Sequence, residues 1–246
     1  MERKKYKLII LFLLLISADL HADYRSEIYF AYVNNRMEQW KNVIDRMEAL
    51  KGKSNEMTLE LINYQYGYIG YCVGVDKKDE AKKYFSLALQ NIDLLEKAGY
   101  NISVVNAYKS AFYGFRIGFN KLSAPFNGPK SIDLAKKAME QDSENYLAYV
   151  QYGNAQFYMP AAFGGSRKEA MEYFLKAKAI LERNPEETKG NWNYLNVMTL
   201  IGQAYTALED YNAARTIYES TLKFEPGFTY VRDELYPGLK KKMDKK

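Results

Sequence analysis

The stretch Asn145–Ile180, NYLAYVQYGNAQFYMPAAFGGSRKEAMEYFLKAKAI, predicts the architecture on which the rest of the chain is built. Residues recur in it at helical spacing over two successive segments. The residues that mark these segments are Tyr149, Tyr152, Gly153, Gln156, Ala170, Phe174 and Ala177. Between them, Pro160 cannot extend a helix, and the pair Gly164-Gly165 permits backbone angles that other residues resist. The stretch therefore predicts two helices joined by a shaped loop.

This pattern resembles a tetratricopeptide repeat (TPR), in which two antiparallel helices cross closely where small residues permit it. The resemblance implies that Gly153 and Ala170 lie at the crossing and that Phe174 fills the space beside it. A later segment carries the same motif, with Gly202 and Ala214 separated by the family's ordinary spacing of 12 residues. Its other matching residues are Tyr205, Tyr218 and Pro226.

An internal repeat supports the duplication of one structural unit. Gly114 precedes Ser131 by 17 residues, and Gly153 precedes Ala170 by the same number. The intervening segments, 121–129 and 159–165, both contain Pro, Phe and Gly. This repeat of 39 residues indicates a row of similar helical hairpins.

We therefore predict an all-α fold, a right-handed α-solenoid of five antiparallel helix hairpins. The expected hairpins span about 23–50, 54–97, 101–142, 144–183 and 191–225. Residues 228–246 are expected to form a capping helix, interrupted at Pro237-Gly238, with a basic tail. A solenoid needs a polar terminal element, although the lysines of this tail could alternatively bind an acidic surface or lipid headgroups.

The N-terminus has the layout of a secretory signal peptide. Basic residues precede the apolar run Leu8–Ile16, and a short polar segment ends at Ala22, after which we expect cleavage. Nine apolar residues are too few to cross a bilayer as a helix, which needs about 20. No cysteine lies near the cut, so the sequence predicts a periplasmic or secreted chain without a lipid anchor.

The expected mature chain lacks the residues of common catalytic and metal sites. His21, the only histidine, lies in the signal segment, and Cys72 is the only cysteine. Histidine-based acid/base catalysis and histidine metal ligation are thereby excluded, and Cys72 is best interpreted as a small core residue. No nucleophile with a base, carboxylate pair or phosphate loop stands out. We predict no enzymatic activity, cofactor, metal or nucleic-acid partner; an enzyme built on a helical toroid would require acidic residues that converge in one cavity.

Tyrosine and phenylalanine are abundant on the first helix of each predicted hairpin, and one helix face cannot place them all in the core. In tetratricopeptide proteins the first helices line a concave surface that holds a partner segment. The resemblance implies a groove lined by Leu147, Val150, Asn154, Phe157, Tyr158, Asn196, Thr199, Gln203 and Thr206. The alternative is that most of these aromatic residues are core.

The sequence thus predicts a non-catalytic scaffold of the cell envelope that presents an aromatic-rich groove to a protein or peptide partner. The alternative is a ligand-holding accessory subunit of a solute-uptake system. In that case the 121–129 and 159–165 loops narrow the groove around a small apolar molecule, in an enclosed apolar pocket of roughly 300 Å³ or more. The loop residues Pro160, Phe163, Gly164 and Gly165 are similar to a feature of the periplasmic tetratricopeptide subunits of tripartite solute transporters. Phe163 could instead fill the gap that the longer loop leaves.

Overall fold

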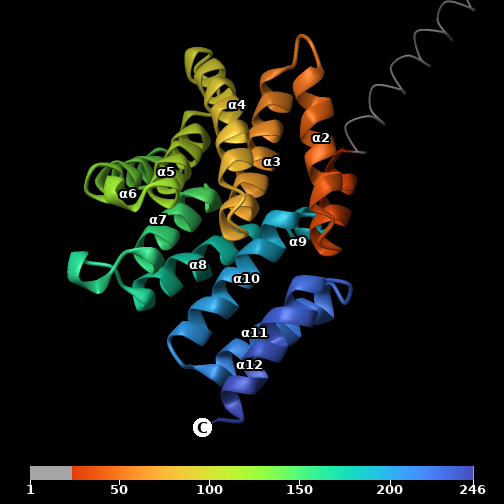
Figure 1. Cartoon of the computed structure of the whole chain (residues 1–246), viewed down its shortest axis with the longest axis vertical. Helices are drawn as coiled ribbons and strands as arrows, with labels where there is room; N and C mark the ends of the chain where they lie inside the picture. The colour runs from red at the N-terminus through yellow and green to blue at the C-terminus, as the bar shows by residue number, and fades with distance from the viewer. Residues whose placement is uncertain (1–23, 246) are drawn as a thin grey trace, which may run out of the picture.

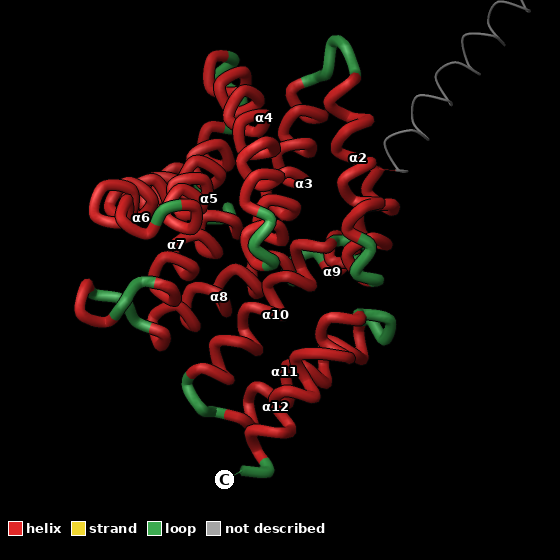
Figure 2. Tube along the Cα trace, in the orientation of Figure 1, coloured by secondary structure: helices red, strands yellow, loops and turns green. Residues whose placement is uncertain are grey.

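The computed structural model describes residues 24–245, and this part of the chain is a row of helices joined by short loops, without a strand (Figures 1 and 2). The all-α prediction is confirmed. The predicted signal peptide, residues 1–22, lies outside the described residues.

Successive helices pair as hairpins. Residues 24–33 are helical, and the named elements that follow are α2 (Met37–Ala49), α3 (Asn55–Gly74), α4 (Lys78–Lys97), α5 (Ile102–Phe119), η1 (Lys121–Ser123), α6 (Ala124–Gln141), α7 (Tyr146–Tyr158), η2 (Ala161–Phe163), α8 (Arg167–Leu181), α9 (Pro185–Thr188), α10 (Trp192–Ala207), α11 (Tyr211–Phe224), η3 (Tyr230–Leu235) and α12 (Tyr236–Met243). Helix α3 packs on α4, α5 on α6, α7 on α8, and α10 on α11. Neighbouring hairpins meet through the pairs α3–α5, α5–α7 and α8–α10. The right-handed superhelical path of this row stays a prediction.

Side-chain caps fix where several helices begin. The Ser54 hydroxyl accepts a hydrogen bond from the Met57 amide at the start of α3, and Asn145 caps α7 in the same way. At α8 the Ser166 hydroxyl accepts from the Glu169 amide, 3.1 Å away. Each cap satisfies an amide that has no partner inside the helix, so these residues set the loop lengths between hairpins.

Two hairpins cross closely at a glycine. A Cβ at Gly153 would lie 2.6 Å from Phe174 Cε1 and 3.3 Å from the Ala170 carbonyl oxygen, and a Cβ at Gly202 would meet the Tyr218 ring. In both places the missing side chain lets an aromatic ring of the second helix lie against the first helix.

The crossing of α5 and α6 lies at a different residue from the one that the internal sequence repeat predicts. Gly114 has no atom within 4 Å of the position of a Cβ, so it is not the point of close approach. That point is instead Ser110 and Ser131, both buried. The Ser110 hydroxyl donates to the Ser131 carbonyl (2.7 Å), and the Ser131 hydroxyl donates to the Ser110 carbonyl (2.8 Å). Ser131 is at the crossing as the spacing indicates, but its partner lies one helical turn earlier than Gly114.

Two predicted interruptions are helical. The 121–129 segment was expected to be a loop, but η1 and the first six residues of α6 occupy it, with Pro125 in the first turn and Pro129 further inside the helix. Pro237 likewise lies in the first turn of α12, directly after the π-helical η3. Both expectations were wrong. The first turn of a helix does not need the amide proton that proline lacks, so α6 can begin around Pro125. At Pro237 the helix continues from the π-helical η3, whose hydrogen bonds already depart from the regular α-helical pattern, so a residue without an amide proton fits there.

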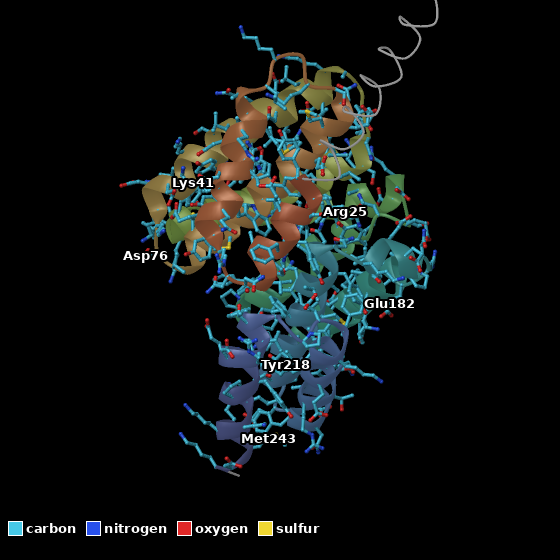
Figure 3. All side chains as sticks on the ribbon, turned by 90° about the vertical axis from the view of Figure 1, so that its right-hand side faces the viewer. Arg25, Lys41, Asp76, Glu182, Tyr218 and Met243 are labelled. Carbon is cyan, nitrogen blue, oxygen red and sulfur yellow. The ribbon has the colours of Figure 1, made fainter. Side chains whose placement is uncertain are left out.

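The helical residues 24–33 contact the C-terminal third of the chain, which lies below them in Figure 3. The Tyr29 hydroxyl donates to Glu225 Oε2 (2.7 Å), and the Thr229 hydroxyl donates to the Val33 carbonyl (3.0 Å). Arg25, labelled in Figure 3, donates to backbone carbonyls around α9, including that of Lys189 (3.2 Å). The two ends of the row are therefore joined.

Aromatic rings fill the region where these ends meet. Trp192 packs edge-on against Trp40, with ring centroids 5.0 Å apart, and against Tyr32 at 5.5 Å. A Cβ at Gly67 would lie 2.6 Å from Trp40 and 2.9 Å from Trp192, so the two rings need glycine there. The inner side of the row is thus packed near its first hairpins.

Candidate functional site

Four tyrosines from distant parts of the sequence gather on the inner side of the row. They are Tyr32 from the helical residues 24–33, Tyr66 from α3, Tyr158 at the end of α7, and Tyr230 from η3. Their phenols are near enough to affect one another's ionisation: besides burial, Tyr158 raises the pKa of Tyr66 and of Tyr230, and Tyr66 and Tyr230 raise the pKa of Tyr32. We call these residues the four-tyrosine cluster.

Amide side chains hold the phenols of this cluster. Gln151 Nε2 donates to the Tyr66 hydroxyl (3.0 Å), and Gln203 Nε2 donates to the Tyr230 hydroxyl (3.3 Å). The Tyr32 hydroxyl donates to Asn196 Oδ1 over a longer 3.5 Å. These bonds connect α7 to α3 and α10 to both ends of the chain, so the rings are fixed by more than one hairpin.

The four rings differ in their access to solvent. Tyr158 is 70% exposed, whereas Tyr66 is 9% exposed and Tyr32 and Tyr230 are half-buried. Phe157 is half-buried and lies edge-on to Tyr158, with centroids 5.0 Å apart. The ring of Tyr158 is therefore the accessible aromatic surface of the cluster, and the ring of Phe157 supports it.

Burial keeps these phenols protonated. It raises the pKa of Tyr66 and of Tyr230, and the interactions of both residues with Tyr158 act in the same direction. The hydrogen bonds from Gln151 and Gln203 oppose the rise in the pKa of Tyr66 and Tyr230 without cancelling it. At neutral pH the cluster therefore offers ring faces and neutral hydroxyls, not phenolate anions.

One buried acceptor beside the cluster has no hydrogen-bond partner among the described residues. It is Asn154 Oδ1, while Asn154 Nδ2 donates to Gln151 Oε1 over 3.5 Å. Gln156 Oε1 on the same helix is also unpaired. A buried carbonyl without a partner costs free energy, and such atoms are suited to accept a hydrogen bond from a bound group.

The structure divides the residues of the predicted groove. Asn154, Phe157, Asn196, Gln203 and Thr206 are partly exposed, and Tyr158 is exposed. Leu147, Val150 and Thr199 are buried, so their assignment to an accessible groove must be corrected. Leu147 packs with the cores of the first hairpins and Val150 with the core that includes α10. The reason is that α7 lies between neighbouring hairpins, which cover more of its surface than one free face allows.

The inserted loop between α7 and α8 stands away from the core (Figure 2). Pro160 and Gly164 are exposed, and Phe163 is 79% exposed, so the expectation that Phe163 fills a gap was wrong. Gly164 has a φ of +93°, and a Cβ at Gly165 would overlap the Met159 carbonyl. Both glycines are thus required by the loop itself.

A cleft of about 390 Å³ lies elsewhere, between the helical residues 24–33, α3 and the start of α10. Its lining residues are Arg25, Glu60, Asn63, Tyr64, Glu187, Gly190, Asn191, Trp192 and Asn193. This lining is mostly polar or charged, so the cleft is not the enclosed apolar pocket expected of a ligand holder. Asn63 Oδ1 and Trp192 Nε1 are buried without a hydrogen-bond partner. Sequence reasoning missed this cleft because no local pattern connects Arg25 to α9 and α10.

Within residues 24–245, no group of three or more His, Cys, Asp or Glu side chains could hold a metal ion. No helix in this part of the chain is long and apolar enough to span a membrane. Cys72 is buried, as expected of a core residue, and burial raises the pKa of its thiol to about 11.

Comparison with known proteins gives a fold but no family. No protein-family model and no curated protein matches the chain. Among solved structures, the HusA haemophore from Porphyromonas gingivalis is similar, with a TM-score of 0.59 over 76% of this chain and 93% of that one. The two sequences are 18% identical, so the likeness supports a shared all-α fold alone.

Proposed function

We propose that this chain is an exported, non-catalytic binding protein that holds a flat aromatic or apolar molecule against the four-tyrosine cluster. The observation that carries the proposal is the ring of Tyr158, which is 70% exposed to solvent and lies edge-on to the half-buried ring of Phe157, with centroids 5.0 Å apart. An exposed ring backed by further aromatic groups suits stacking on a planar ligand, and neutral hydroxyls and amides can orient it. Because the similar structure is named a haemophore, porphyrins are the first ligands to test.

The chemistry of the cluster favours stacking over ligation of iron. Residues 24–245 contain no histidine, so a tyrosine oxygen would be the natural ligand to a haem iron. Ligation requires a phenolate, and tyrosine forms a phenolate in water only near pH 10, so the neutral phenol predominates at neutral pH. We therefore expect haem and metal-free protoporphyrin to bind with similar affinity.

The test is a titration with both porphyrins, followed by the porphyrin absorbance and the protein fluorescence. Tyr158→Ala is expected to weaken both affinities about tenfold, which corresponds to about 1.4 kcal/mol. Tyr158→Phe is the matched control, since it keeps the ring and removes the oxygen, and it should bind like the parent protein. Loss of haem binding alone in Tyr158→Phe would mean ligation, and the absence of porphyrin binding by the parent protein would reject the proposal.

A second candidate is the tetratricopeptide-like scaffold that the sequence predicts. It is supported by the close helix crossings at Gly153 and Gly202 and by the partly exposed amides of Asn154, Asn196 and Gln203, which could pair with a peptide backbone. Affinity capture from the envelope fraction separates the two candidates. A stoichiometric protein lost on Phe157→Ala with Tyr158→Ala would favour the scaffold, and a co-purifying small molecule would favour the ligand holder, with or without a role in solute uptake.

Export itself is part of the proposal. It predicts that the protein recovered from the envelope or the medium begins at Asp23. N-terminal sequencing of that protein is the direct check, and recovery of the intact chain only from the cytoplasm would contradict it.

A further inference from the structure

Two neighbouring hairpins carry exposed apolar side chains at their tips. Leu122 is 85% exposed and Phe126 is 76% exposed where α5 turns into α6, and Phe163 is 79% exposed between α7 and α8. Helices α5 and α7 pack against each other, and both tips follow their carboxyl ends. We call residues 120–130 together with 159–168 the two-tip surface. Large apolar side chains this exposed, repeated at equivalent places, indicate an interaction surface.

The loops hold these side chains outward. Asn120 Oδ1 accepts from the Leu122 amide (3.1 Å), and the Ser123 hydroxyl donates to the Asn120 carbonyl (2.7 Å). In the other tip the Phe163 amide donates to the Pro160 carbonyl (2.9 Å) and the Ser166 amide to the Gln156 carbonyl (3.1 Å). Because each tip is a hydrogen-bonded turn, the exposed side chains are fixed by the backbone.

The charge around the tips has one sign. No Asp or Glu occurs in 110–132 or in 145–168, whereas exposed basic residues do. These are Arg116, Lys121, Lys130, Arg167 and Lys168. None of these five side chains forms an ion pair with a carboxylate in the described part of the chain. Arg116 and Lys130 lie over the Tyr113 ring. Arg167 donates a hydrogen bond to the Ala207 carbonyl.

We propose that the two-tip surface docks this protein on an anionic lipid membrane. The apolar side chains would enter the interface between headgroups and acyl chains, while the basic side chains contact lipid phosphates. A bilayer fits better than a protein partner, because the apolar groups stand on separate tips and exposed cations lie close to them in the chain. Protein interfaces usually have a continuous core depleted of charge.

The test is co-sedimentation with vesicles, using the exported chain freed of residues 1–22. Residues 24–245 contain the packed cores described above, so this chain carries the whole described fold. We expect binding to equimolar phosphatidylcholine and phosphatidylglycerol vesicles that weakens with salt, and little binding to phosphatidylcholine alone.

Two sets of substitutions assign the binding to the tips. Leu122→Ser with Phe126→Ser and Phe163→Ser should lower the affinity about tenfold or more. Lys121→Gln with Lys130→Gln and Lys168→Gln should lower it about fivefold for each charge removed. Both sets should leave the thermal melt and the porphyrin titration unchanged, because these side chains lie outside the cores and the four-tyrosine cluster.

Matched controls use other exposed groups. Val75→Ser with Leu94→Ser removes apolar side chains that are 48% and 57% exposed elsewhere, and it should not change vesicle binding. Lys240→Gln with Lys241→Gln and Lys242→Gln tests the basic C-terminal tail. The proposal is overturned if the parent protein does not bind anionic vesicles, if binding persists in both tip variants, or if it is lost only with the tail lysines.

Discussion

Single glycines determine how closely the helices of a hairpin approach. At Gly153 even one methyl group would lie 2.6 Å from Phe174, which is 1% exposed and has no free space to move into. We predict that Gly153→Ala lowers the free energy of unfolding by about 1 to 3 kcal/mol. The measurement is chemical denaturation followed by circular dichroism.

Gly114 is the matched control for this substitution. It occupies the equivalent place in the internal repeat and lies inside α5, but it has no neighbour within 4 Å of a Cβ. Gly114→Ala should therefore stabilise the protein, by up to about 1 kcal/mol, since alanine favours a helix. Equal effects of the two substitutions would contradict the assigned crossings.

At this scale the sequence is informative only where a residue acts within its own hairpin. Gly153 and Gly202 could be identified because glycine at the crossing is part of a local pattern. Gly67 could not be identified in this way. Glycine is needed there because the rings of Trp40 and Trp192 approach its backbone, and these two residues lie far apart in the chain. The same limit explains why Leu147 and Val150 were placed on an accessible surface: helical spacing assigns residues to a face but does not show how many neighbours cover that face.

At the scale of the helix pair, α5 and α6 are joined by the reciprocal hydrogen bonds of Ser110 and Ser131. We predict that Ser110→Ala and Ser131→Ala each cost about 1 kcal/mol of unfolding free energy. The double variant should cost less than the sum, with a coupling of about 0.5 kcal/mol or more, because both residues belong to one contact. Denaturant titration of the four proteins measures this cycle.

Ser86→Ala provides the reference for helix propensity. Ser86 is exposed in α4, and its hydroxyl donates only to the Lys82 carbonyl of its own helix (3.0 Å). Subtracting its effect isolates the contribution of the interhelical bonds. Strictly additive effects of the two buried serines would show that the pair does not act as a unit.

The helices and most loops could be predicted because periodicity and caps are local signals, as at Ser54 and Ser166. Proline was misleading as a signal at Pro125 and Pro237. It was interpreted as a break, but Pro125 fits the first turn of α6, and Pro237 follows the π-helical η3 without ending the helix.

At the scale of the whole molecule, the contacts of residues 24–33 with α9, α10 and η3 join the two ends of the row. No sequence pattern indicates these contacts, since they depend on how far the row curves over all its hairpins. They also explain the candidate site. Tyr32 and Tyr230 reach the same place as Tyr66 and Tyr158 only because the ends of the chain meet, so the sequence could indicate Tyr158 and Gln203 but not the cluster that they join.

Buried tyrosines make the stability of the whole chain sensitive to alkali. Tyr68 and Tyr84 are fully buried, and burial raises the pKa of both, reinforced by hydrogen bonds to Glu80 and Asp45. In the unfolded chain tyrosine ionises near pH 10. Above that pH the unfolded state has lost protons that the folded state keeps, so stability falls as pH rises, by about 1.4 kcal/mol per pH unit for each such tyrosine.

We therefore predict that the protein keeps its stability up to about pH 10 and then unfolds cooperatively as the pH approaches 12. Exposed tyrosines should ionise near pH 10 in the folded protein, whereas the remaining tyrosinate absorbance should appear together with the loss of helical circular dichroism, because ionisation of the buried rings requires unfolding. The same absorbance titration in denaturant is the control, in which all the tyrosines should ionise near their ordinary pKa. If all the tyrosines ionised near pH 10 while the helical signal persisted, the rings of Tyr68 and Tyr84 between α3 and α4 would be open to water, and the packed interior on which the four-tyrosine cluster rests would be disproved.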